Sequence, residues 1–146
     1  MLYKIAHILR DKLPWIWDVI GIINSFLFEL RYDGKMGQVQ NILTHFTKTT
    51  EEDGNALFYK IEVLCKDNLP MLAKMFAEQP ASAFDFFKPH GFDELSLNKL
   101  VKDKSFLAYI VVAEGNAQQK VCVGYFFQRS FFWGKSFRGY MTDYRW

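Results

Sequence analysis

The feature that most constrains the fold is an uninterrupted apolar run, FLAYIVV, at Phe106–Val112. A strand that carries apolar residues on both of its faces is typical of the centre of a sheet, where both faces are buried. The segment EGNAQQ then supplies a turn, and Val121–Arg129 is strand-like and can return beside the run in the antiparallel sense. The sequence therefore predicts an antiparallel sheet built around Phe106–Val112.

The C-terminal segment predicts that this sheet continues as a meander. Trp133, Gly134 and Lys135 form a turn signal, and Ser136–Tyr144 follows as another strand. Gly124 lies inside the preceding strand, where a glycine indicates a bulge or a kink.

An earlier strand and two helices are predicted ahead of the apolar run. Leu57–Leu64 alternates with the period of a strand. Asp67 is placed to cap a helix whose first turn tolerates Pro70 and which Pro80 ends, and Asp93 is placed to cap a second helix. The expected buried faces are Leu69, Leu72, Ala73 and Phe76 in the first helix and Leu97, Leu100 and Val101 in the second.

The loop between these helices is aromatic, in a chain with 15 Phe residues and 18% aromatic residues in all. It carries Phe84, Phe86, Phe87 and Phe92, which indicate a thick core or a surface that awaits a partner. We interpret His90, in the same loop, as a hydrogen-bonded structural residue rather than a base, because no carboxylate stands at a fixed spacing to orient it.

No metal-ligand pattern is present in the sequence, since the three histidines are dispersed and the two cysteines form no Cys-x-x-Cys pair. This cysteine usage favours a reducing, cytoplasmic setting over a disulfide framework. We expect Cys122 to be an inert, small hydrophobic residue, because no histidine or helix terminus near it would lower its pKa. The net charge of +2, with both signs interspersed, gives no reason to expect nucleic-acid binding.

The N-terminal segment at residues 13–32, LPWIWDVIGIINSFLFELRY, predicts a helix that is apolar over most of its circumference. Its charge-free run, Val19–Phe28, is ten residues long, whereas a bilayer span needs about 20. Two interpretations remain open. The helix packs on the domain or on a second copy of the chain, or it lies on a membrane surface with Trp15 and Trp17 at headgroup depth and Lys4, Arg10, Lys12 and Arg31 near anionic lipid.

The best boundary candidate is the polar, glycine-containing stretch from Asp33 to Asn55. Within it, Val39, Ile42, Leu43 and Phe46 predict a short helix. The expected organisation is a helical arm over residues 1–50 and a domain over 57–146. The expected class is α+β, with a mixed, mainly antiparallel sheet flanked by helices and preceded by the helical segment.

The order strand, helix, helix and three strands resembles a known family. The segments FYKIEVLCKDNLPMLAKMF, FLAYIVVAEGNAQQKVCVGYFFQRSFF and GYMTDY are similar to the N-terminal half of the GNAT superfamily of acetyl-CoA-dependent N-acetyltransferases. The most similar part, VCVGYFFQR, matches the third strand of that family, in which a valine-glycine pair precedes aromatic and aliphatic residues and often an arginine. The resemblance covers about residues 57–146.

The resemblance implies a function and a cofactor. The expected activity is transfer of acetyl from acetyl-CoA to a small amine, such as an amino sugar or an amino acid. The family's fourth strand leads into a glycine loop whose amides hold the cofactor pyrophosphate, whereas no Gly-x-Gly occurs in these 146 residues. We therefore expect an incomplete GNAT-like unit, an N-terminal portion that is inactive alone.

The resemblance also implies roles for single residues. A backbone amide of the fourth strand polarises the thioester carbonyl and would lie in Tyr140–Asp143, at or near Met141. Asp143 is the candidate base, and its alternatives are a solvated strand-end carboxylate or a partner of Arg138 or Arg145. Tyr125, Arg129, Tyr140 and Thr142 are candidate contacts to the acceptor amine, and the alternative for Tyr125 and Arg129 is cross-strand pairing with Arg138, Tyr140 or Thr142.

A non-enzymatic alternative stands beside the transferase. It is an interaction or scaffold module that pairs through an open last strand at residues 136–146, forms a homodimer, or contacts a membrane peripherally through residues 13–32. We expect a cytoplasmic protein in either case, membrane-peripheral in the latter form.

Overall fold

The computed structural model describes residues 12–32, 44, 47–52, 55–85, 87–115 and 119–146. These residues form an α+β structure, which confirms the predicted class. In chain order, the elements are α2 (Pro14–Tyr32), β1 (Thr47–Glu52), β2 (Asn55–Val63), α4 (Leu69–Ala77), the 3₁₀ turn η1 (Ala81–Phe84), α5 (Glu94–Lys102), β3 (Phe106–Glu114), β4 (Lys120–Ser130) and β5 (Ser136–Thr142). The helix predicted around Val39–Phe46 lies outside the described residues.

The five strands form one sheet in the order β1-β2-β3-β4-β5, and every described pair of neighbours is antiparallel. The predicted apolar run is β3, the central strand, and it is buried along nearly its whole length. Strand β1, TKTTEE, was not predicted, because its polar residues give no apolar alternation. The sheet therefore begins before residue 57, within the stretch taken as a boundary.

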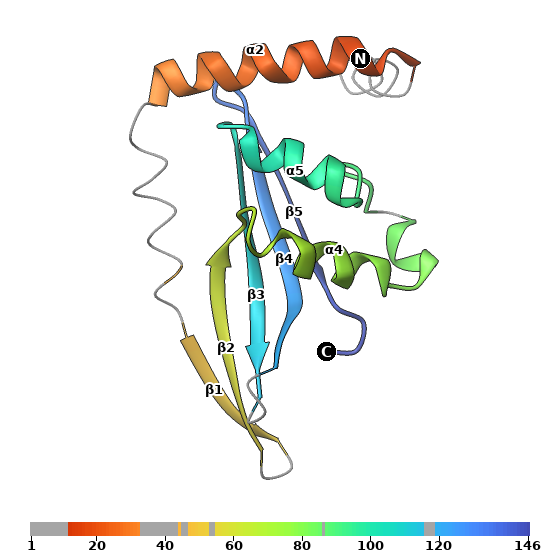
Figure 1. Ribbon diagram of the computed structural model, residues 1–146. Helices are drawn as coiled ribbons and strands as arrows, with labels where there is room; N and C mark the ends of the chain where they lie inside the picture. Colours follow the sequence, from red (N-terminus) through yellow and green to blue (C-terminus); the bar gives the residue numbers. More distant parts are fainter. Residues whose placement is uncertain (1–11, 33–43, 45–46, 53–54, 86, 116–118) are drawn as a thin grey trace.

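Helices α4 and α5 lie on one face of the sheet, and α2 lies across one end of the strands (Figure 1). On the face with α4 and α5, the two helices and alternate residues of β3, β4 and β5 form the core: Leu69, Leu72, Met75, Phe76, Leu97, Leu100, Phe106, Ala108, Ile110, Val112, Cys122, Tyr125, Phe127 and Met141. The other face is also apolar, since the ring of Tyr109 is fully buried and stacks on Phe126 at 4.8 Å between centroids.

Local signals explain where most elements begin and end. The predicted cap of the second helix is confirmed, because the Asp93 carboxylate accepts a hydrogen bond from the Ser96 amide at 2.9 Å. The predicted cap at Asp67 is wrong. Asn68 precedes α4, and its side-chain oxygen accepts from the Cys65 amide, so it closes the turn that leads into the helix.

The two predicted glycine features are confirmed. Gly134 lies in the β4–β5 turn with φ of 94°, a left-handed conformation that glycine adopts without strain. Gly124 lies where the β3–β4 register shifts between Val111 and Val112, which is a β-bulge.

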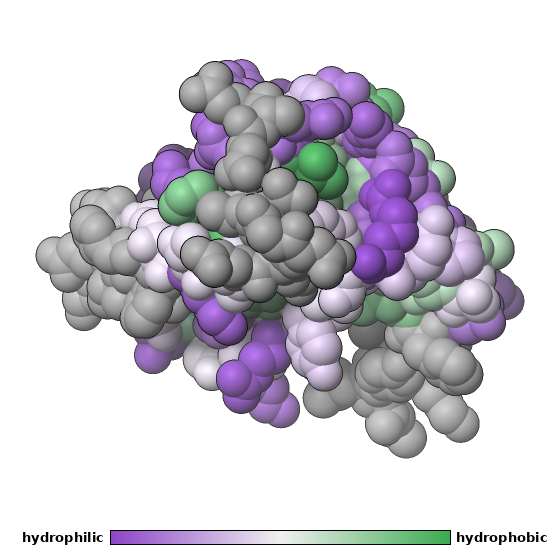
Figure 2. Space-filling model, turned by 90° about the horizontal axis from the view of Figure 1, so that it is seen from below, coloured by the Kyte–Doolittle hydropathy of each residue, from purple (hydrophilic) through white to green (hydrophobic). Residues whose placement is uncertain are grey.

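The two ends of the molecule differ in polarity. Figure 2 views the end opposite α2, where hydrophilic and pale residues predominate among the coloured atoms and green ones are scattered. The exposed apolar residues of the described chain include six on α2, namely Trp15, Val19, Ile22, Ile23, Phe26 and Leu30, and Leu13 just before it.

Candidate functional site

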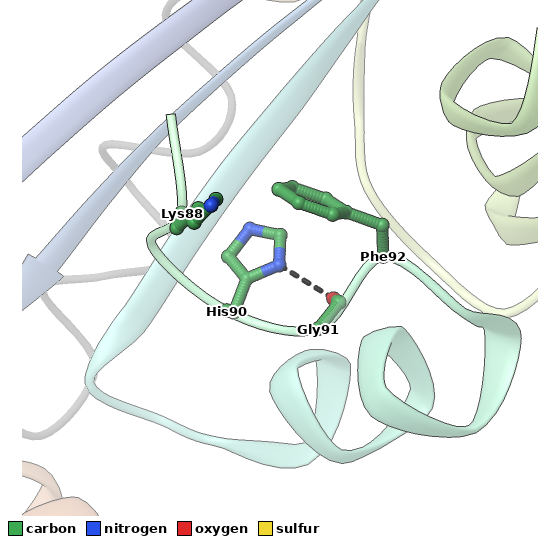
Figure 3. A pocket seen from close by; sticks show the side chains of 4 residues that line it. All are labelled: Lys88, His90, Gly91 and Phe92. Carbon is green, nitrogen blue, oxygen red and sulfur yellow. Dashed lines mark hydrogen bonds between the residues drawn. The ribbon is translucent and has the colours of Figure 1, made fainter. Parts of the chain in front are cut away.

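The most organised polar contact beside the aromatic core joins His90 to Tyr125. His90 lies in the loop between α4 and α5, and its Nε2 lies 2.8 Å from the Tyr125 hydroxyl on β4. Its Nδ1 lies 2.7 Å from the Gly91 carbonyl oxygen (Figure 3). A carbonyl only accepts, so Nδ1 carries the proton, Nε2 accepts from the tyrosine, and the imidazole is the neutral Nδ1–H tautomer.

Burial keeps this imidazole neutral. It lowers the pKa of His90 from 6.5 to about 4, because the charged form would lose its hydration and Arg129 repels it. Burial also raises the pKa of Tyr125 above its usual value. At neutral pH the pair is therefore an uncharged hydrogen bond, and the predicted hydrogen bonding of His90 is confirmed.

An open hollow of about 360 Å³ lies beside His90, lined by Lys88, His90, Gly91 and Phe92 (Figure 3). Aromatic rings surround the imidazole: Phe76, Phe92, Phe106 and Phe127 lie 5.4–6.3 Å from it between centroids. The hollow is therefore lined by a lysine, an imidazole edge and an aromatic wall, and none of the described residues that line it is a carboxylate.

Asp143, the predicted base, lies just after β5 and is 1% exposed. Its Oδ1 accepts from the Arg145 backbone amide at 3.0 Å and from Arg145 Nε at 2.9 Å, and its Oδ2 contacts Arg145 Nη2. These bonds lower the pKa of the Asp143 carboxyl below its usual 3.8. The interpretation of Asp143 as a solvated carboxylate is wrong, because the side chain is buried. The geometry matches the interpretation as a partner of Arg145, and a carboxylate held in this way is a weak proton acceptor.

The Arg145 guanidinium extends this contact to α4. Its Nη2 lies 2.7 Å from Glu78, just after the helix ends. Gln79 makes a second link, since its Oε1 accepts from the Tyr144 amide at 3.1 Å while its Nε2 donates to Met75. The segment after β5 is thus tied to the C-terminal end of α4, a link that sequence spacing did not reveal.

The backbone N–H and C=O groups of successive β5 residues point alternately toward β4 and toward the outer edge of the sheet. Phe131 N donates to Lys135 O, and Asp143 N donates to Val123 O, so the odd-numbered residues of β5 face β4. The amide of Met141 therefore points at β4. The amides of Tyr140 and Thr142 point to the outer edge, where the described sheet ends. An amide that polarises a bound carbonyl at this edge would come from these two residues.

The side chains named as acceptor contacts do not converge on one cavity. Tyr125 is buried in the core, and Tyr140 is 81% exposed on the edge strand. Arg129 forms an ion pair with Asp103 at 3.2 Å and lies over the Phe106 ring. The cross-strand partners proposed for Tyr125 and Arg129 are wrong, because the register places Met141 opposite Tyr125 and Phe137 opposite Arg129.

Cys122 is buried, and burial raises its pKa to about 12, so it is an inert thiol as predicted. Among the residues that the structure describes, no three His, Cys, Asp or Glu side chains lie together as a metal site would require. In the same residues, no helix has the length and apolar character needed to cross a bilayer.

Comparison of the chain with protein-family models, with curated proteins and with solved structures finds no match in any of the three. Functional inference therefore depends on the residues and geometry given above.

Proposed function

We propose that residues 57–146 are the acceptor-side portion of a GNAT-type N-acetyltransferase that transfers acetyl from acetyl-CoA to a small amine, such as an amino sugar or an amino acid. The observation that carries the proposal is the element order: β2, then α4 and α5 on one face, then the antiparallel meander β3, β4 and β5. This is the order on which the sequence resemblance was based.

The proposed chemistry needs few groups from this portion. The neutral amine attacks the thioester carbon, the C–S bond breaks, the amine loses a proton, and the departing thiolate takes one up. The outward amides of Tyr140 and Thr142 would stabilise the negative charge that develops on the carbonyl oxygen. In this proposal Asp143 positions Arg145 and the segment after β5, and the amine arrives already deprotonated.

The direct test uses S-acetylpantetheine, which carries the thioester but not the pyrophosphate. ¹H–¹⁵N correlation spectra of the chain, titrated with this compound, should show shifts concentrated at the amides of Tyr140 and Thr142. Acetyl-CoA should bind no more tightly, because these 146 residues contain no Gly-x-Gly loop to hold its pyrophosphate.

A matched variant sharpens this test. Thr142→Pro removes an amide that faces the outer edge without removing a bond to β4, and proline is tolerated at such edge positions. The variant should keep the spectrum of the folded sheet and lose the response at Tyr140. Shifts that avoid β5 altogether, or that persist unchanged in Thr142→Pro, would contradict the proposal.

The second candidate is an interaction module that pairs through β5. It is favoured by the outer edge itself, because Arg138, Tyr140 and Thr142 direct their main-chain groups away from β4. In that case the amides of these three residues should gain protection from hydrogen exchange when a partner strand binds, and they should not respond to S-acetylpantetheine.

A further inference from the structure

The rotation of α2 about its axis is fixed by a buried polar side chain. Asn24 is 4% exposed and donates to Ser105 Oγ at 2.9 Å and to the Ser130 carbonyl at 3.0 Å. Its Oδ1 accepts from the Phe132 amide at 3.1 Å. All three bonds reach segments far away in sequence, so any other rotation would leave buried polar groups unsatisfied.

Further contacts on the flanks of α2 hold the same orientation. Ser25 Oγ accepts from the Lys104 amide at 2.8 Å, and Arg31 donates to the Phe132 carbonyl at 2.5 Å. Asp18 and Glu29 form ion pairs with Lys99 at 3.7 Å and Lys104 at 3.6 Å. Both acidic residues of α2 are thus neutralised within the chain.

This orientation turns an uncharged apolar face outward. The outward face consists of six residues spaced along α2: Trp15, Val19, Ile22, Ile23, Phe26 and Leu30. At 3.6 residues per turn they occupy roughly 100° of the circumference, on the side opposite Asn24. Their exposed fractions run from 46% for Val19 to 70% for Ile22.

We infer that the outward face of α2 is a self-association surface, on which two copies of the chain pack α2 against α2 in antiparallel orientation. This inference does not depend on the proposed acetyltransferase activity. Residues 15, 19, 22 and 26 follow spacings of four, three and four, as in a helix-pair seam, and Leu30 lies one turn further along the same face. A two-fold axis near Ile22 would place Trp15 of one copy beside Leu30 of the other, so the seam is self-complementary.

The area agrees with a second copy as the occupant. A large apolar residue has on the order of 150–200 Å² of accessible surface, so six residues exposed to this extent offer roughly 500–700 Å². A stable interface buries about 800 Å² on each partner. The area of one copy is thus close to that of a standard interface.

The charge pattern argues against a membrane surface. A helix that lies in the bilayer interface usually carries Lys and Arg on its polar face, where they meet anionic headgroups. Arg31 is the one basic residue within α2, and its guanidinium is bound to the Phe132 carbonyl. The uncharged, apolar face of α2 in a second copy of the chain therefore fits this surface better than a charged lipid surface does.

The test is the oligomeric state in solution. Sedimentation equilibrium should give a dimer for the natural chain at about 50 μM, and Ile22→Glu should weaken association about 100-fold or more, because the charge enters the seam twice in a symmetric dimer. Leu95→Glu is the matched control: Leu95 is 71% exposed on α5, away from the seam, so this variant should dimerise as the natural chain does. Circular dichroism and thermal unfolding verify that both variants fold.

Three results would overturn the inference. The first is a natural chain that stays monomeric at the highest concentration reached. The second is a Leu95→Glu variant that dissociates as readily as Ile22→Glu. The third is a chain that is monomeric in buffer and binds vesicles of phosphatidylcholine and phosphatidylglycerol through α2, with binding lost in Ile22→Glu, which would assign the face to a membrane.

Discussion

The neutral, buried imidazole of His90 makes the stability of the protein depend on pH in a defined window. In the unfolded chain His90 takes up a proton near its ordinary pKa of 6.5, whereas in the folded protein it does so only near pH 4. Between these values the unfolded state binds more protons, so acidification favours unfolding. The contribution of His90 is complete above about pH 6.5 and is lost as the pH falls toward 4.

The magnitude follows from the size of the pKa shift. A shift from 6.5 to about 4 corresponds to roughly 3 kcal/mol, at about 1.4 kcal/mol per unit. The His90 ring keeps part of its surface at the rim of the hollow, so we expect about 2–3 kcal/mol. With a urea m-value of about 1–3 kcal/mol/M, this moves the unfolding midpoint by roughly 1 M.

Urea unfolding at about pH 7.5 and about pH 4.5 measures this effect when the natural chain is compared with His90→Gln. Glutamine can keep one donor and one acceptor but does not titrate. We therefore expect the loss of stability on acidification to be smaller in His90→Gln by about 2–3 kcal/mol. An equal loss in both proteins would refute the reasoning, since the pH dependence would then come from other groups.

Four further substitutions test the packing and the polar contacts. Asn24→Ala should lower the free energy of unfolding by about 1–3 kcal/mol, because it leaves groups buried under α2 without partners, and urea unfolding measures the loss. Arg145→Ala should lower the free energy of unfolding by leaving the buried Asp143 carboxylate without its cation, and Asp143→Asn in that background should recover part of the loss, both measured by urea unfolding. Gly139→Ala should lower the melting temperature, because a Cβ there would lie 2.7 Å from the Phe127 ring; unchanged melting would show that the ring moves aside. Leu72→Ala should cost about 2–5 kcal/mol, because Leu72 is fully buried beneath α4.

Much of the sheet could be predicted from the sequence because its signals are local. The run at Phe106–Val112 marks the central strand, and Gly124 and Gly134 mark the bulge and the turn. The capping role of Asp93 was equally readable, whereas the one predicted for Asp67 is wrong. Asn68 competes for the same turn, and only the fold shows which of the two side chains reaches a free amide.

The candidate site was less predictable because its contacts join distant segments. The His90–Tyr125 hydrogen bond spans 35 positions, and the contact of Arg129 with Asp103 spans 26. Strand register then decides which residues stand opposite one another, and the turn sets that register. Successive residues of a strand direct their amides to opposite sides, so the sequence alone could show that the amides of Met141 and Tyr140 point in opposite directions. Which of the two faces β4 depends on the pairing register.

The docking of α2 separates the two proposals made for this chain. Asn24 binds the residues just before β3 and at the end of β4, so α2 is fixed to the central strands at one end of the sheet (Figure 1). The amides of Tyr140 and Thr142 lie along the outer edge of β5, and the apolar face of α2 points away from the sheet. A dimer formed through α2 would therefore leave both β5 edges open. Ile22→Glu should dissociate the dimer while the response of Tyr140 and Thr142 to S-acetylpantetheine stays unchanged, and a joint loss of both properties in a folded variant would mean that the two surfaces are coupled.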